Sequence, residues 1–216
     1  MTATLIGASG LIGSYLLEEL LTDPAFDTVR ILIRRPMNIS HPKLEKKLVD
    51  FYDNDSLLVA LSNSDVVFCT VGTTQKKVKG DKDAYRKVDF DIPVKAARFC
   101  KMTGCGKFIL VSSVGANSKS KNFYLKLKGE VENAVKEVGL KTVHIMQPSI
   151  LLGERKESRL GEKIGKSVMT FFSFLIPAKY KPIHARDVSI AMLAVSKKNE
   201  EGYFVYENKE IFSNLY

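Results

Sequence analysis

The sequence predicts an α/β protein in which a doubly wound parallel sheet carries helices on both faces. The first observation is that short apolar runs alternate with helix-period segments along all 216 residues, as repeated strand–helix–strand units do. The second is a glycine-rich turn at residues 7–13, between the first apolar run and the first amphipathic segment. The third is that no segment reads as a linker or a repeat, which favours one domain over residues 1–216.

The individual elements follow from this periodicity and from Gly and Pro stop signals. Strands are expected at Thr2–Ile6, Thr28–Ile33, Lys47–Asp50, Val66–Val71, Phe108–Ser112, Thr142–Met146 and Tyr203–Tyr206. Helices are expected at Leu11–Leu21, Ser56–Ser62, Asp83–Thr103, Phe123–Val138, Gly161–Phe174 and Asp187–Ser196. Ligands of such sheets bind beyond the carboxyl ends of the strands, so functional residues are sought in the loops that follow them.

Composition limits the functional classes. The longest apolar run is too short to cross a bilayer and the N-terminus has no signal-peptide pattern, so we expect a soluble, cytoplasmic protein. Three cysteines without metal-ligand spacing predict no metal site. The net charge of +9 raises the question of nucleic acid, but the lysines are not interleaved with aromatic residues that stack on bases, which disfavours that partner.

The glycine-rich turn has the layout of a cradle for a dinucleotide phosphate. Gly7 would permit a tight strand-to-helix turn, Gly10 the approach of a pyrophosphate, and Gly13 close packing of helix on sheet. The helix N-terminus adds free N–H groups and a partial positive charge. The spacing GxxGxxG matches the usual fingerprint only in part, and a turn without a ligand is the alternative. We favour binding because strand, turn and helix all fall where the mechanism needs them.

Three later segments bear on the identity of the cofactor. Arg34 and Arg35 stand where such folds meet the adenosine ribose, and guanidinium groups suit the 2′-phosphate of NADP(H). The alternative is that both arginines only cover a sheet edge. Asp50 and Phe51 end the third expected strand and would flank the adenine, or Asp50 would simply form a turn. Gly72–Thr74 follow the fourth strand, where backbone can approach the inner ribose, or they form a plain loop.

Tyr124 and Lys128 are four residues apart at the start of an expected helix, so their side chains share one face. A lysine ammonium beside a tyrosine favours the phenolate and makes the hydroxyl a usable proton donor or acceptor. Tyr124 also begins an apolar stripe, so a half-buried core residue is the alternative. Ser112 and Ser113 end the preceding strand, and one hydroxyl would polarise a substrate carbonyl. The Ser-Ser-Val-Gly pattern favours Ser113, although the spacing to Tyr124 fits Ser112 about as well.

Together these residues resemble the short-chain dehydrogenases/reductases, and most closely a small atypical branch of that family. The resemblance covers about residues 5–160. Its motifs are Gly7-Ala8-Ser9-Gly10, Arg34-Arg35, Gly72-Thr73-Thr74, Ser112-Ser113, Tyr124-Leu125-x-x-Lys128-Gly129-Glu130-Val131-Glu132 and Glu157-Ser158-Arg159. It implies a Rossmann fold and NADPH bound by Ser9, Gly10, Leu11, Ile12, Arg34, Arg35, Val71, Gly72, Tyr124 and Lys128, with contacts from Leu151 and Arg159. Two departures are the missing Asn-Asn-Ala-Gly after the fourth strand and Gln147-Pro148-Ser149 in place of Arg-Pro-Gly.

The sequence therefore supports two functional hypotheses. The first is an NADPH-dependent oxidoreductase of the carbonyl reductase type, in which residues 151–186 contribute the pocket for a small apolar substrate. Tyr124 would donate the proton, Lys128 would assist it and hold the ribose, and Ser112 or Ser113 would orient the carbonyl. The second is an NADP(H)-binding regulator without catalysis, which couples the state of the cofactor to a protein partner. A homodimer is compatible with either hypothesis.

Overall fold

The centre of the molecule is a seven-stranded sheet in which every neighbouring pair is parallel. The computed structural model describes residues 1–153 and 177–214. The strand order is β3-β2-β1-β4-β5-β6-β9, so the chain reverses its direction of winding between β1 and β4. The strands are β1 (Thr2–Ile6), β2 (Thr28–Ile33), β3 (Leu44–Leu48), β4 (Val66–Cys69), β5 (Lys107–Val111), β6 (Thr142–Gln147) and β9 (Gly202–Glu207).

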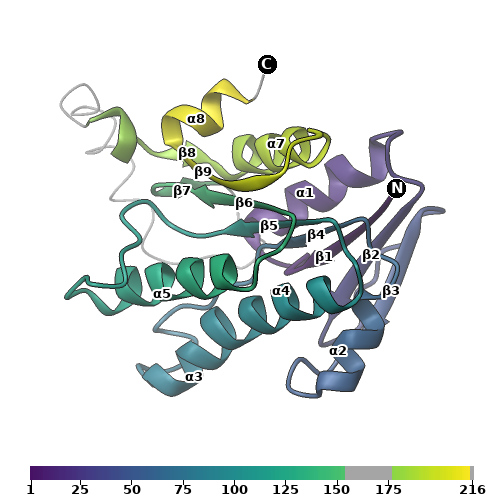
Figure 1. Cartoon of the computed structure of the whole chain (residues 1–216), viewed down its shortest axis with the longest axis horizontal. Coiled ribbons are helices and arrows are strands. Elements are labelled where there is room, and N and C mark those ends of the chain that lie inside the picture. Colours follow the sequence, from purple (N-terminus) through teal and green to yellow (C-terminus); the bar gives the residue numbers. More distant parts are fainter. Residues whose placement is uncertain (154–176, 215–216) are drawn as a thin grey trace.

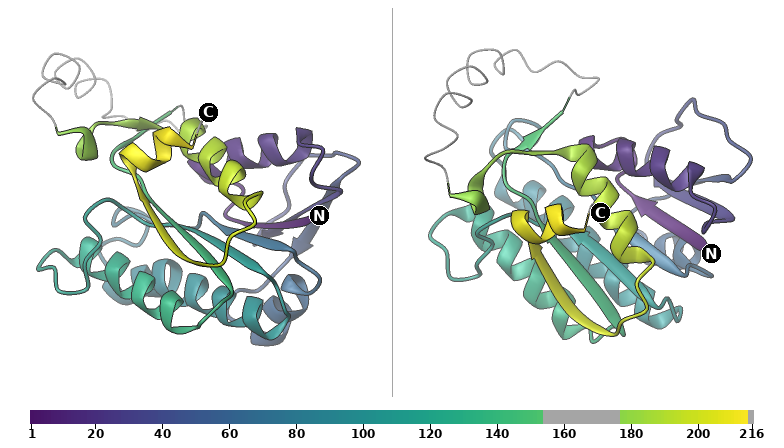
Figure 2. Two further views of the ribbon diagram at one scale, coloured as in Figure 1. Left: turned by 45° about the horizontal axis from the view of Figure 1, so that its top comes forward. Right: turned by 90° about the horizontal axis from the view of Figure 1, so that it is seen from above.

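Helices cover both faces of this sheet, which confirms the expected fold class. The helices α1 and α7 lie side by side on one face, with α2, α4 and α5 on the other (Figure 1, Figure 2). The helical segments are α1 (Leu11–Thr22), α2 (Asn54–Leu61), α3 (Lys82–Arg86), the π-helical η1 (Lys87–Asp91), α4 (Ile92–Met102), α5 (Phe123–Glu137), the 3₁₀ turn η2 (Ala178–Tyr180), α7 (Ala185–Ser196) and α8 (Asn208–Ser213).

The central strands are apolar because both of their faces are buried. In β4, Val66 and Phe68 belong to the core beneath α1 and α7, whereas Val67 and Cys69 belong to the core beneath α2, α4 and α5. Successive side chains of a strand point to opposite faces, so a strand between two helical layers needs apolar residues at every position. This two-sided burial holds the carboxyl ends of β1, β4 and β5 at one edge of the sheet.

Two expected elements differ from the structure by more than one or two residues at an end. The third strand is Leu44–Leu48 rather than Lys47–Asp50, because an edge strand with only β2 beside it tolerates the exposed lysines of its sequence. The expected helix Asp83–Thr103 is interrupted by the π-helical segment η1, immediately before Pro93 in the first turn of α4. Proline has no N–H to donate, and π-helical turns absorb such a break within a helix.

Some elements gave too weak a pattern to be expected. The strands β7 (Leu151–Leu152) and β8 (Ile183–His184) pair in a separate two-stranded sheet, and they are too short to show alternation. The short helix α8 follows β9 directly. The expected helix Gly161–Phe174 lies outside the described residues.

Candidate cofactor and active site

The glycine-rich turn joins β1 to α1 at the carboxyl edge of the sheet, and its glycines are required by close packing. Gly7 has a φ of 97°, and a Cβ there would lie 2.7 Å from Thr70 Oγ1 and 2.9 Å from the Val71 amide. A Cβ on Gly13 would lie 2.1 Å from the carbonyl oxygen of Gly7. A Cβ on Gly10 would approach only the Gly7 oxygen, at 3.1 Å, and the Thr70 oxygen, at 3.9 Å. Gly10 is therefore the least crowded of the three glycines.

The beginning of α1 is suited to an anion. No side chain caps the helix at Gly10, and its first turn contains no acidic residue. The N–H groups of that turn and the positive end of the helix dipole thus remain available to a phosphate. Ser9 is exposed and Leu11 is partly buried, whereas the Ile12 side chain lies in the core, so Ile12 can reach a ligand only through its backbone.

A cavity of about 340 Å³ lies beyond the carboxyl ends of β2 and β3. It is lined by Arg34, Leu48, Val49, Asp50, Phe51 and Tyr52. The structure thus brings together three of the residues expected around the adenosine, while Arg35 is exposed and does not line the cavity. Asp50 Oδ1 also accepts a hydrogen bond from the Tyr52 amide at 2.9 Å, so its two interpretations, ligand contact and turn, are compatible. Leu48, Val49 and Tyr52 were not singled out, because apolar residues at a strand end carry no chemical signal.

The loop after β4 is held in place by side chains from the neighbouring helical segments. The Thr73 amide donates to Asp89 Oδ2 at 2.7 Å, and the Tyr85 hydroxyl donates to the Thr73 oxygen at 3.2 Å. A Cβ on Gly72 would lie 3.6 Å from Asp89 Oδ1, an ordinary contact, so the protein itself does not require a glycine there. This loop, with Val71, lies against Gly7 of the turn.

The first two turns of α5 carry Tyr124 and Lys128. The helix begins there because Asn122 caps it, with Oδ1 accepting from the Tyr124 amide at 2.9 Å and the Leu125 amide at 3.2 Å. Lys128 Nζ lies 5.8 Å from the centre of the Tyr124 ring. Its side chain is buried and forms an ion pair of 3.1 Å with Asp89 Oδ1.

Asp89 was missed in the sequence, although a signal for it exists. Tyr85, Asp89, Ile92 and Ala96 follow one another at helical spacing, and all four are buried. An aspartate in an otherwise apolar helical stripe indicates a buried charge that needs a partner. The spacing showed this position on the buried face, but it did not show that Lys128 would be the partner.

The two serines after β5 have different surroundings. Ser112 is buried and donates its hydroxyl hydrogen to the carboxylate of Glu132. Gln147 Nε2 donates to both oxygens of the same carboxylate, at 2.9 and 3.0 Å. Burial raises the pKa of Glu132, against the effect of these donors. Ser113 is partly buried, and its hydroxyl makes only a 3.4 Å contact with the Val114 oxygen, so of the two it is the less committed to the protein itself.

The segment after β6 reaches the glycine-rich turn. Leu151 lies in β7, packs against the core beneath α1, and pairs with Ile183 of β8. A Cβ on Gly153 would lie 3.1 Å from the Leu11 side chain, so the chain leaving β7 runs beside the start of α1. Arg159 and most of the expected substrate region lie outside the described residues.

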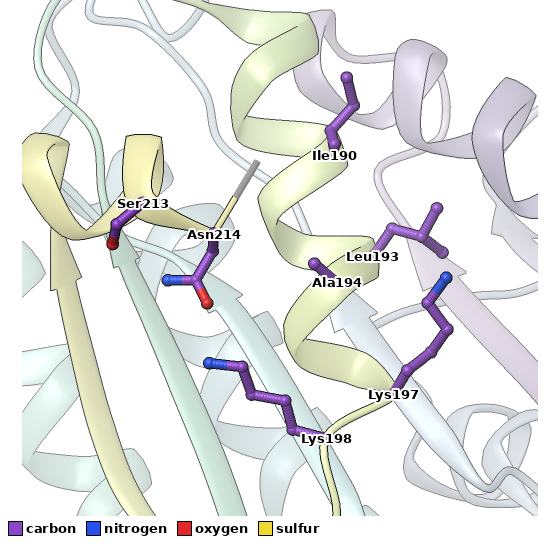
Figure 3. A pocket seen from close by; sticks show the side chains of 7 residues that line it. All are labelled: Ile190, Leu193, Ala194, Lys197, Lys198, Ser213 and Asn214. Atoms are coloured by element: carbon purple, nitrogen blue, oxygen red, sulfur yellow. The ribbon is translucent and has the colours of Figure 1, made fainter. Parts of the chain in front are cut away.

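A second cavity, of about 570 Å³, lies between α7 and α8 (Figure 3). It is lined by Ile190, Leu193, Ala194, Lys197, Lys198, Ser213 and Asn214. Lys107, the first residue of β5, donates to the backbone oxygens of Ser196 and Lys198, which places this end of α7 at the amino ends of the strands. None of the expected cofactor residues lines this cavity.

Two further findings concern residues 1–153 and 177–214 only. They contain no helix that is long and apolar enough to span a membrane. They also contain no cluster of three His, Cys, Asp or Glu side chains with the geometry of a metal site.

The reversal of winding between β1 and β4, with a glycine-rich turn at the same edge, defines a Rossmann-type dinucleotide-binding protein. Comparison with known families agrees, since the sequence pattern of a family described as NAD(P)H-binding matches residues 7–170. The chain belongs to this NAD(P)H-binding family, and the resemblance to atypical short-chain dehydrogenases/reductases is confirmed.

Individual relatives support this assignment. The chain is 36% identical to Protein HTATIP2 of Rattus norvegicus over 165 residues, which are 75% of this chain and 67% of that protein. It is 31% identical to Protein FMP52, mitochondrial, of Candida albicans over 208 residues, covering 94% and 90% of the two chains. The solved structure of MoeE5 in complex with UDP-glucose and NAD superposes with a TM-score of 0.74 at 16% identity, covering 99% of this chain and 80% of that one. At this identity the superposition shows the fold alone.

The comparisons also correct one expectation. Several fungal relatives are named as mitochondrial proteins, which contradicts the expected cytoplasmic location. The expectation rested on the lack of a recognisable N-terminal signal, and that reasoning is too weak to place a protein in a compartment.

Proposed function

We propose that the protein is an NADPH-dependent oxidoreductase of the carbonyl reductase type that acts on a small apolar substrate. The observation that carries the proposal is the buried Lys128 ammonium one helical turn after Tyr124. Both residues lie on the helix that follows β5, at the edge of the sheet that also carries the glycine-rich turn. A buried charge beside a phenol is the arrangement that proton transfer to a carbonyl oxygen needs.

The residues of this chain fit a dinucleotide. The less crowded position at Gly10 and the uncapped start of α1 would hold the pyrophosphate, and the cavity beside Arg34 would hold the adenosine half. When bound, NADPH supplies the hydride. Tyr124 would donate a proton to the substrate oxygen, and Lys128 would stabilise the tyrosinate that remains and hold the nicotinamide ribose. The Ser113 hydroxyl would donate a hydrogen bond to the carbonyl, because Ser112 is bound to Glu132.

The preference for NADPH over NADH is proposed on the position of Arg34 in the cavity. A guanidinium forms charge-assisted hydrogen bonds with a 2′-phosphate, each contributing about 1.5–3 kcal/mol. Arg34→Ala should therefore weaken NADPH binding by about 10- to 150-fold and leave NADH binding nearly unchanged, measured by calorimetry. Arg98→Ala, which removes an exposed charge from α4, is the matched control. Equal losses for both nucleotides would contradict the assignment of the ribose site.

Turnover is tested by following NADPH absorbance with a panel of aldehydes, ketones and quinones. We expect reduction of at least one class, and a loss of about 100- to 10,000-fold in Tyr124→Phe, the range that general acid catalysis contributes. Tyr203→Phe is the control, because Tyr203 lies near the amino end of β9 and its hydroxyl donates to the backbone oxygen of Glu132, at 3.4 Å, rather than to a side chain of the proposed site.

The alternative function, an NADP(H)-binding regulator, draws support from the distance of 5.8 Å between Lys128 Nζ and the centre of the Tyr124 ring. In that case the lysine would serve to bind the ribose rather than to assist Tyr124. Tight NADPH binding without turnover of any panel member, and equal affinities in wild type and Tyr124→Phe, would favour the regulator and contradict the reductase.

A further inference from the structure

The carboxylate of Asp89 joins three parts of the candidate site. Its Oδ1 pairs with Lys128 Nζ at 3.1 Å, and its Oδ2 accepts from the Thr73 amide at 2.7 Å. Asp89 is 1% exposed, so neither oxygen is satisfied by bulk water. One side chain thus connects the helix that carries the lysine and the loop that follows β4.

Asp89 lies inside the π-helical segment η1, which occupies Lys87–Asp91 between α3 and α4. Helical spacing places it on the same buried face as Tyr85 and Ile92. The packing of α3 on α5 fixes the segment from the other side, through the edge-on contact of Tyr85 with Phe123 at 5.7 Å and the ion pair of Arg86 with Glu130 at 2.6 Å. The segment that carries the Asp89 carboxylate is therefore held against α5 by an aromatic contact and an ion pair.

We infer that Asp89 is a positioning residue, which keeps Lys128 charged and fixes its ammonium beneath Tyr124 while anchoring the loop at Thr73. The inference rests on the proposed function in one respect, since it assigns a purpose to Lys128. Asp89 acts through Lys128 and Thr73, and it contacts neither cofactor nor substrate in this proposal. A lysine without such a partner at this depth would lose its proton readily, and it could then neither stabilise a tyrosinate nor hold ribose hydroxyls as a cation.

The electrostatic surroundings of Lys128 support this role. Burial is the largest effect and lowers the pKa of Lys128, but Asp89 together with Tyr124 and Cys69 outweighs it, so the net pKa is raised. Burial raises the pKa of Asp89, against the effects of Lys128 and of the Thr73 amide. Glu132, one turn further along α5, also interacts with Lys128 electrostatically, but it is held by Ser112 and Gln147. Among the described residues, Asp89 is the only carboxylate in ion-pair contact with Lys128.

The decisive measurement is the charge of Lys128 itself. In protein with isotopically labelled lysine side chains, the signal of Lys128 is assigned by its loss in Lys128→Met and followed by NMR against pH. We expect Asp89→Asn to lower the pKa of Lys128 by about one to three pH units, the range that a close opposite charge produces. Asp91→Asn, in the same segment and outside this ion pair, should leave it unchanged. An unchanged Lys128 titration in folded Asp89→Asn would overturn the inference.

This measurement needs neither substrate nor turnover, so it fails or succeeds independently of the proposed reductase activity. If Asp89→Asn does not fold, Asp89→Glu decides, because it keeps the charge and displaces the carboxylate. Lys128 should then stay protonated while NADPH affinity falls at least about 10-fold, the effect of misplacing a supporting residue by a fraction of an ångström. Wild-type NADPH affinity in Asp89→Glu would show that the position of the carboxylate does not matter, and would reject the role.

Discussion

Replacing Gly13 by Ala tests the packing of the glycine-rich turn most directly. The new Cβ would lie 2.1 Å from the Gly7 oxygen and 2.7 Å from Thr70 Oγ1. The turn must move by about 1 Å before such a contact approaches van der Waals distance. Overpacking of this kind costs about 1–3 kcal/mol, against which alanine gains up to about 1 kcal/mol in helix propensity.

A 2.1 Å clash with a backbone oxygen belongs at the upper end of this range, so the expected result for Gly13→Ala is a net loss of about 2 kcal/mol in the free energy of unfolding, measured by urea denaturation. A displaced turn should also weaken NADPH binding in calorimetry. Gly10→Ala separates the two effects, because its Cβ would meet the Gly7 oxygen at 3.1 Å and the Thr70 oxygen at 3.9 Å, and Gly10 stands at the start of α1, where the pyrophosphate is proposed. We expect Gly10→Ala to lose NADPH affinity with a smaller loss of stability than Gly13→Ala.

Gly106→Ala is the matched control for both variants, since a Cβ there meets only the Asp65 oxygen at 3.9 Å. Its stability and its affinity for NADPH should equal those of the wild type. Wild-type stability in Gly13→Ala would refute the packing argument, and wild-type NADPH affinity in Gly10→Ala would refute the phosphate cradle.

Three further predictions concern His144 and the two serines after β5. Burial lowers the pKa of His144 to about 4, so the unfolded chain binds a proton on this residue more tightly than the folded protein does. The contribution of His144 to the free energy of unfolding is therefore complete above about pH 6.5. It should fall by about 3 kcal/mol as the pH is lowered toward 4. Urea denaturation at several pH values should show a clearly smaller fall in His144→Gln, and an identical pH dependence would contradict the assignment. Ser112→Ala should lower the free energy of unfolding by about 1–3 kcal/mol, because Glu132 loses a buried donor. Ser113→Ala should stay within about 0.5 kcal/mol of the wild type in urea and reduce turnover of any substrate found, whereas the reverse pattern would exchange the roles of the two serines.

The bounds of β1 and β2 were predicted best. The bounds of β1 and β2 agree with the sequence-based ranges Thr2–Ile6 and Thr28–Ile33, because continuous apolar and β-branched runs bounded by turn residues are a strong local signal. The edge strand β3 was shifted, since one-sided pairing leaves its sequence polar. The break in the long helix before Pro93 was missed, although Pro93 lies in the interior of the expected helix Asp83–Thr103, where a proline usually breaks or kinks a helix.

The candidate site, like the fold, could be predicted from the sequence only in part. The glycine-rich turn and the Tyr124–Lys128 spacing could be recognised in the sequence, because each lies within a few residues and the function proposed for it depends on local geometry. The cavity beside Arg34 was anticipated only in part, since Leu48, Val49 and Tyr52 have no distinguishing chemistry. The sequence left the choice between the two serines open, and the proposal for Ser113 rests on the hydrogen bond of Ser112 to Glu132, which the sequence does not show.

By itself, the sequence determined the parallel sheet with helices on both faces and the class of ligand at its carboxyl edge, because periodicity and glycine spacing act over short distances along the chain. Only the tertiary structure decided that Asp89 pairs with Lys128 and that Glu132 binds Ser112. Each of these contacts joins residues from different parts of the chain. A buried polar side chain needs a hydrogen-bonding partner, and the packing of helices and strands decides which residue that partner is, so the local sequence pattern does not show it.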